Sequence, residues 1–158
     1  CGLEESYLER LSKIPLYERD ESRFGDHGNY DPVLCTKLIR NYRSHENILS
    51  IPSLLFYDNE LKPQAPYHIT NAMLGYEFLP NEECPIIFHG VRGQNIQESD
   101  SPSWFNPAEG LQVARYLELI LSKGINIEDI GIIAPYRKQT QKLRQLLDSL
   151  NLPKPKVS

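Results

Sequence analysis

The amino-acid sequence predicts an α/β fold in which helices cover both faces of a parallel sheet. Three apolar runs, residues 36–40, 85–89 and 130–134, have the length and composition of buried strands, and each precedes a segment with helical periodicity. A further strand is expected at 154–157. Because strands that alternate with helices are joined by right-handed crossovers, this order predicts parallel neighbours in a single sheet.

Apolar residues recur at helical spacing in four segments, which are 4–13, 46–57, 107–122 and 139–150. Ser44 is expected to cap the second of these helices, and Pro52 predicts a break within it near residues 50 and 51. We expect the buried side of this helix to be formed by Ile48, Leu49, Leu54, Leu55 and Phe56.

The helix over 107–122 has the clearest start signal in the chain. Asn106 is placed to cap it, Pro107 occupies its first position, and Glu109 is expected to reach back to the backbone N–H of the cap. Gly124 is expected to end the helix in a left-handed conformation. The apolar faces of the last two helices are predicted to comprise Val113, Tyr116, Leu117, Ile120 and Leu121, and Leu143, Leu146, Leu147 and Leu150.

Composition limits the classes of protein that fit. The chain has 158 residues, about one domain, and a net charge of -4, which argues against a generally basic surface that coats nucleic acid. No apolar run is long enough to span a membrane, and no basic-then-apolar signal segment opens the chain. Three scattered cysteines, Cys1, Cys35 and Cys84, favour a reducing compartment without a disulfide framework. Both ends of the chain look cut, so we expect a fragment.

Tyr42 and Arg43 follow the first predicted strand. In an open α/β sheet ligands bind at the carboxyl ends of strands, where an aromatic ring can stack on a base and a guanidinium can bind a phosphate. The alternative is that Tyr42 packs against the next helix and Arg43 forms a surface ion pair. The pattern alone leaves both interpretations open.

A second candidate site, Pro135 to Gln139, follows the strand at 130–134. Two cations, an aromatic ring and an amide at the start of a helix suit contacts to a nucleic-acid backbone. The alternative is an exposed basic turn without a ligand.

Several catalytic patterns are absent from the sequence. The four histidines have no metal-ligand spacing, and there is no G-x-S-x-G motif. The Gly-rich phosphate loop G-x-x-x-x-G-K-[ST] is missing, so the chain cannot hold a triphosphate and its magnesium unaided. Any nucleotide would be bound by one wall of a shared site.

Two motifs resemble those of superfamily 1 helicases. The stretch Leu38 to His45, Leu-Ile-Arg-Asn-Tyr-Arg-Ser-His, is similar to motif IV. Residues Ile130 to Tyr136, followed by Gln139, are similar to the I-T-P-Y-x-x-Q strand and turn of the up-frameshift-like branch, with Ala134 in place of the usual hydroxyl residue. Together with residues 86–93 and 101–109, these motifs resemble the RNA helicases related to the Moloney leukaemia virus 10 protein, in particular their Armitage branch.

The resemblance implies that residues 1–158 are an incomplete RecA-like second motor domain, running from motif IV to just before motif V. It implies an ATP-dependent, 5′-to-3′ RNA helicase of Piwi-interacting RNA (piRNA) biogenesis and transposon silencing. Tyr42 would stack on adenine, and Arg43 would be an arginine finger that reaches the γ-phosphate. The residues along the RNA would be Pro135, Tyr136, Arg137 and Gln139.

The resemblance also implies ATP and Mg²⁺ held mainly by a first motor domain outside this chain. The implied partners are single-stranded RNA, that first domain and Piwi-pathway proteins, with no direct membrane insertion. The implied location is the cytoplasm of germ cells, in perinuclear granules or on the mitochondrial surface through partners. The fragment alone would be inactive. Two alternatives stay open: a module that docks partners through the polar loops 15–32 and 58–83, and a DNA helicase lobe of the same superfamily.

Overall fold

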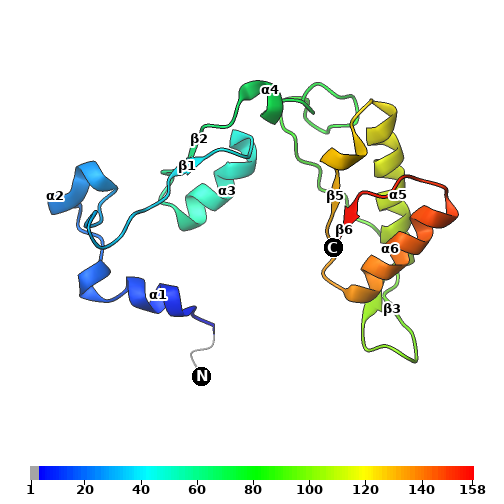
Figure 1. The fold of residues 1–158 in the computed structure, drawn as a ribbon, viewed down its shortest axis with the longest axis horizontal. Coiled ribbons are helices and arrows are strands. Elements are labelled where there is room, and N and C mark those ends of the chain that lie inside the picture. The colour runs from blue at the N-terminus through cyan, green and yellow to red at the C-terminus, as the bar shows by residue number, and fades with distance from the viewer. Residues whose placement is uncertain (1–3) are drawn as a thin grey trace. The chain divides into compact units, whose positions relative to one another are not determined.

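The computed structural model describes residues 4–158, which form two compact units (Figure 1). The first unit ends at Ile87, and the second comprises Phe88–Ser158. Helices and short two-stranded sheets make up both units, so the α/β class is confirmed. Among the described residues, no helix is long and apolar enough to cross a membrane.

The first unit contains short helices around one parallel strand pair. Its elements are α1 (Tyr7–Ser12), η1 (Pro15–Tyr17), α2 (Glu21–Phe24), η2 (Gly25–His27), β1 (Arg40–Asn41), α3 (Glu46–Phe56), β2 (Lys62–Pro63) and α4 (Tyr67–Thr70). The segment 15–32, expected to be a polar loop, therefore contains three short helical turns. The segment 58–83, expected to be a polar loop, contains the short helix α4.

The strand pair β1–β2 supports the first candidate site. Arg40 and Asn41 pair in parallel with Lys62 and Pro63, and the Lys62 N–H donates to the Ile39 carbonyl at 2.7 Å. The sequence places this strand at 36–40, whereas the ladder forms only at its carboxyl end. The strand therefore ends at Asn41, and Tyr42 follows it.

Lys37 anchors the segment that leads into β1. Its ammonium lies 2.6 Å from carboxylate oxygens of both Asp58 and Glu60 in the α3–β2 connection, and Arg19 contacts the same two acids. Burial lowers the pKa of Lys37, but the hydrogen bonds to Asp58 and Glu60 outweigh burial and raise the pKa overall. These ion pairs thus join the α3–β2 connection to the segment that precedes β1.

Helix α3 differs from its prediction in three ways. His45 caps the helix instead of Ser44, because the His45 Nδ1 accepts from the Asn47 N–H at 3.1 Å. Pro52 lies inside an unbroken helix and removes one backbone donor without ending it. Only Leu49 of the five predicted apolar residues is buried, beside Ser53, whose hydroxyl accepts from the Leu61 N–H. The others are exposed: Ile48, Leu54, Leu55 and Phe56.

The second unit is built on two long helices (Figure 1). Its elements are β3 (Ile96–Gln97), β4 (Trp104–Phe105), α5 (Pro107–Ser122), η3 (Ile127–Asp129), β5 (Gly131–Ile132), α6 (Arg137–Ser149) and β6 (Lys156–Val157). The helices predicted at 107–122 and 139–150 and the strands at 130–134 and 154–157 are confirmed, with small shifts in their ends.

The core of this unit lies between α5, α6 and the β5–β6 pair. Its buried residues are Ala114, Leu117, Leu143, Leu147 and Val157. Strands β5 and β6 are parallel, and the ladder continues from the Ala134 N–H to the Ser158 carbonyl at 2.8 Å. Gly124 adopts a φ of +82° after α5, as predicted for a helix terminator. Leu150, expected in the core, is exposed.

The predicted single sheet is not formed among the described residues. Residues 85–89 form no ladder in the described part of the chain, and Phe88 is 97% exposed. Residues 4–158 instead contain three separate two-stranded sheets, two parallel and one antiparallel, β3–β4. An apolar run favours the extended conformation of a strand. Ladder hydrogen bonds, however, also require a partner strand alongside that run.

Candidate functional site

The first candidate site is the turn between β1 and α3. The side chain of Asn41 closes this turn, since its Oδ1 accepts the backbone N–H groups of Arg43 at 3.0 Å and Ser44 at 2.8 Å. This Asx turn follows directly from the residue type at the strand end. At the other end of the turn, His45 is buried and starts α3.

Tyr42 and Arg43 project from this turn into solvent. Tyr42 is 65% exposed, so it does not pack against α3 as the structural alternative required. Arg43 is exposed, and no described residue forms an ion pair or hydrogen bond with its guanidinium. Both side chains are therefore accessible to a ligand, which is the arrangement that nucleotide binding needs.

A pocket of about 180 Å³ adjoins the turn. It is lined by residues from the start of α3 and from the β2–α4 segment, including Ser44, His45, Pro63 and Tyr67. Pockets that enclose a whole ligand are larger, at ~300 Å³ or more. A pocket of this volume suits one side of a nucleotide site whose other side is formed by another domain.

The second candidate site is the turn that leads from β5 into α6. Pro135, Tyr136 and Arg137 are all exposed, and Tyr136 occupies the N-cap position without a side-chain hydrogen bond to the helix. An aromatic ring and a guanidinium are thus presented together on a backbone fixed by β5 and α6. These groups suit stacking and phosphate contacts.

Gln139 has a different role from the predicted RNA contact. It is only 8% exposed, its Oε1 accepts from the Asn106 N–H at 2.6 Å, and its Nε2 donates to the Asn106 carbonyl at 3.3 Å. Both ends of the amide are therefore used inside the unit, where they join the start of α5 to the first turn of α6. Direct RNA contact by Gln139 does not fit this geometry.

The same pairing changes the predicted cap of α5. Asn106 Oδ1 accepts from the Ala108 and Glu109 N–H groups, as expected for an N-cap. Glu109, however, accepts from the Asn106 side-chain amide, because the backbone N–H of Asn106 is already bound by Gln139. Sequence spacing identifies the cap but cannot show a competitor from another helix.

An ionic cluster that the sequence did not indicate lies at the start of α6. Glu98, in the β3–β4 hairpin, pairs with Lys138 and, at 2.6 Å, with Lys142. Hydrogen bonds from Lys138 and then Lys142 lower the pKa of the Glu98 carboxyl, and the bond to Glu98 raises the pKa of Lys138. The basic turn is thus partly neutralised within the unit.

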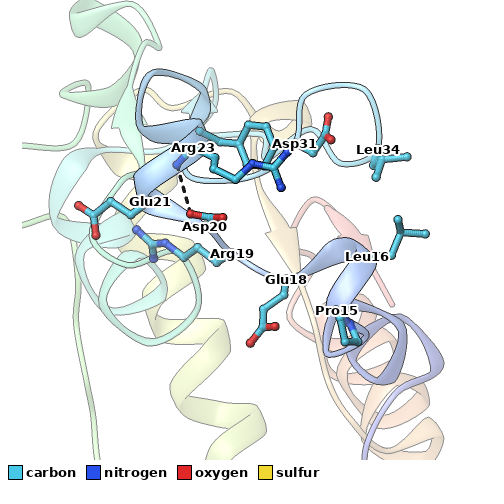
Figure 2. A pocket seen from close by; sticks show the side chains of 10 residues that line it. Pro15, Leu16, Glu18, Arg19, Asp20, Glu21, Arg23, Asp31 and Leu34 are labelled. Carbon is cyan, nitrogen blue, oxygen red and sulfur yellow. Dashed lines mark hydrogen bonds between the residues drawn. The ribbon is translucent and has the colours of Figure 1, made fainter.

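A second pocket lies elsewhere in the first unit, beside η1 and α2 (Figure 2). It has a volume of about 410 Å³ and a mixed charged lining that includes Glu18, Arg19, Asp20 and Arg23. Asp20 caps α2 by accepting from the Arg23 N–H at 3.1 Å, and Arg19 is bound by Asp58. The pocket contains none of the predicted site residues, and part of its charged lining already has partners.

The described residues fit part of an ATP site. The exposed guanidinium of Arg43 suits a phosphate oxygen, and Tyr42 offers a face to a base. Residues 4–158 contain no group of three or more His, Cys, Asp or Glu side chains that could hold a metal ion. Cys35 and Cys84 are free, whereas Cys1 lies outside the described residues. Tyr42 and Arg43 therefore offer groups that suit a nucleotide.

Comparison with known families assigns the chain. The sequence profile of a family described as AAA domain matches residues 4–158. The chain belongs to the AAA domain family. This family is of the type that forms the second lobe of superfamily 1 helicases, in agreement with the two helicase motifs.

Curated relatives agree with the predicted branch. The chain is 51% identical over 154 residues to human "RNA helicase Mov10l1", which covers 96% of the chain. It is 46% identical to zebrafish "Putative helicase mov-10-B.1" over 92% of the chain and 36% identical to Drosophila "Probable RNA helicase armi" over 99%. The chain spans only 13%, 15% and 14% of these relatives. The predicted similarity to the Moloney leukaemia virus 10-like and Armitage proteins is confirmed.

Proposed function

We propose that this chain is part of the second motor lobe of an ATP-dependent RNA helicase that moves 5′ to 3′. In the full protein, the lobe would complete a RecA-like parallel sheet with helices on both faces. The observation that carries the proposal is Arg43, exposed and unpaired among the described residues and held by the Asn41 turn at the end of β1. The names of the relatives add RNA as the substrate class.

In this proposal ATP and Mg²⁺ would be held mainly by a first motor domain, where water would cleave the bond between the β- and γ-phosphates to give ADP and phosphate. Tyr42 stacks on the adenine and Arg43 stabilises charge on the γ-phosphate. Arg43 gains a partner only when the two lobes close, and it loses that partner after hydrolysis. Pro135, Tyr136 and Arg137 contact the RNA backbone, so repeated closing and opening moves the strand.

The proposal extends to the biological setting of the full protein. We infer piRNA biogenesis and transposon silencing in germ cells, with Piwi-pathway proteins as partners. The location would be the cytoplasm, in perinuclear granules or at the mitochondrial surface through those partners. Kinship with the Mov10l1 and Armitage branch supports this setting.

The deciding experiment is Arg43→Ala in the full protein. We expect ATP hydrolysis to fall by ~10³-fold, as for loss of an arginine finger, while most RNA binding is retained. Arg40→Ala is the matched control, because Arg40 is an exposed arginine in β1 three residues before the proposed finger. Near-normal ATPase activity in Arg43→Ala would exclude the proposed role.

A second experiment tests the RNA turn. Tyr136→Ala combined with Arg137→Ala should weaken binding of single-stranded RNA, while ATPase activity without RNA persists. Unchanged affinity would favour an exposed turn without a ligand.

Comparing the stimulation of ATPase activity by RNA and by single-stranded DNA separates the RNA helicase from the DNA helicase alternative. Partner binding that survives Arg43→Ala would indicate an additional docking role.

A further inference from the structure

The β3–β4 hairpin brings acidic side chains against two lysines of α6. Glu98 bridges Lys138 and Lys142, and Asp100 lies 3.9 Å from the Lys138 ammonium. The two lysines are four residues apart, so they lie on the same side of the helix. Two positive charges are thereby gathered around one carboxylate.

The lysines are held in place by more than the carboxylate. The Lys138 N–H donates to the Ser103 hydroxyl at 3.1 Å, which joins the base of the hairpin to α6. The Lys142 ammonium lies 5.0 Å from the centre of the Phe105 ring, a cation–π contact. The side chains of Lys138 and Lys142 are only 13% and 34% exposed. Their ammonium groups are therefore positioned in advance for an anion.

The carboxylate that these lysines bind can be replaced. The Glu98 side chain is 35% exposed and that of Asp100 is 78% exposed, so all three ion pairs lie at the solvent boundary, where such pairs are weak. A phosphate oxygen accepts hydrogen bonds from lysine as a carboxylate does. The two lysines and two acids sum to zero charge, which leaves little net attraction for nucleic acid while the acids remain bound.

We propose that Lys138 and Lys142 form a backbone-phosphate site for single-stranded RNA that Glu98 occupies in the absence of RNA. The inference deepens the proposed function and rests on it, because Lys138 directly follows the exposed pair Tyr136 and Arg137. An RNA strand that reaches Arg137 has its next phosphates near the lysines. It displaces Glu98, so the hairpin reduces the affinity of this lobe for RNA.

The test is Glu98→Gln in the full protein, with binding of a fluorescent oligouridine measured by anisotropy over a series of KCl concentrations. The variant should bind about fivefold more tightly at low salt, because removing the Glu98 charge frees both lysines. The slope of log affinity against log salt should steepen by ~0.7 for each added phosphate contact. Adding Lys138→Gln and Lys142→Gln to the variant should cancel both gains.

Glu118→Gln is the matched control, because Glu118 is an exposed glutamate on α5 and its loss changes the net charge equally. It should change neither affinity nor slope. Unchanged RNA affinity in Glu98→Gln, with only a lower melting temperature, would overturn the inference and leave the proposed function intact. Absence of RNA binding in both the wild type and the variant would overturn the proposed function and this inference together.

Discussion

Asn41 controls the backbone of Arg43 without touching its guanidinium. The Asn41 side-chain oxygen accepts the Arg43 N–H at 3.0 Å, and the guanidinium has no partner of its own among the described residues. The start of the arginine side chain is therefore fixed, while its charged end is free to meet a ligand. In the proposed function, Asn41 is a positioning residue for Arg43.

Asn41→Ala should reduce ATP hydrolysis by ~10-fold or more, because a misplaced catalytic group loses the advantage of a fixed orientation. Asn41→Asp retains the oxygen acceptor and should keep most of the activity. Steady-state ATPase assays with saturating RNA provide the measurement. Equal losses of ATPase activity in the Ala and Asp variants would show that the oxygen acceptor at position 41 is not what supports hydrolysis.

Helix α3 should depend on His45 and not on Ser44. His45→Ala removes the side-chain acceptor for the Asn47 N–H, a change that typically costs ~1 kcal/mol. Ser44→Ala leaves this cap intact. Hydrogen exchange of the Asn47 amide should accelerate in the first variant and remain at the wild-type rate in the second. Faster exchange in Ser44→Ala, with a wild-type rate in His45→Ala, would instead support Ser44 as the cap, as predicted from the sequence.

Gln139 should be needed for the stability of the second unit. Gln139→Ala leaves the buried N–H of Asn106 without its acceptor, which costs ~1–3 kcal/mol. Gln141→Ala is the matched control on the exposed side of α6 and should change stability by less than ~0.5 kcal/mol. Thermal unfolding followed in parallel for both variants tests this. A neutral Gln139→Ala would contradict the structural role.

The Glu98 ion pairs should contribute stability that depends on pH. Because Lys138 and Lys142 hold the pKa of Glu98 below its usual 4.5, the carboxylate stabilises the fold above that pH. The contribution is lost as the pH falls through the lowered pKa. The difference in melting temperature between wild type and Glu98→Gln should therefore be constant near neutral pH and shrink in acid. A difference that does not change with acidification would contradict this assignment.

Local signals predicted the second unit well. The cap at Asn106, the glycine after α5 and the leucine spacing of α6 act within a few residues, so the sequence contains them directly. The order strand, turn and helix around Tyr42 and Arg43 was also predicted, and in the structure Asn41 is both the last residue of β1 and the acceptor that closes this turn. These features depend on neighbours along the chain.

The incorrect predictions involve residues that are distant in sequence. Residues 85–89 have the composition of a strand, but their ladder depends on a partner strand that their own sequence cannot reveal. The periodicity of α3 indicates an apolar face, yet only Leu49 of that face is covered in the first unit. Gln139 was assigned to RNA because the motif could not show that Asn106, in another helix, binds its amide.

The bond between Gln139 and Asn106 has an evolutionary consequence. Gln139 binds the backbone of residue 106, so several capping residues could replace Asn106 without breaking the connection. Position 139 has no such freedom, because the site needs an acceptor and a donor on one side chain of this length. Across homologues, we expect substitutions among Asn, Asp, Ser and Thr at position 106 beside a persistent glutamine at 139. A glutamine at this position would then indicate that α5 and α6 are joined in the same way, even in proteins whose RNA contacts have diverged.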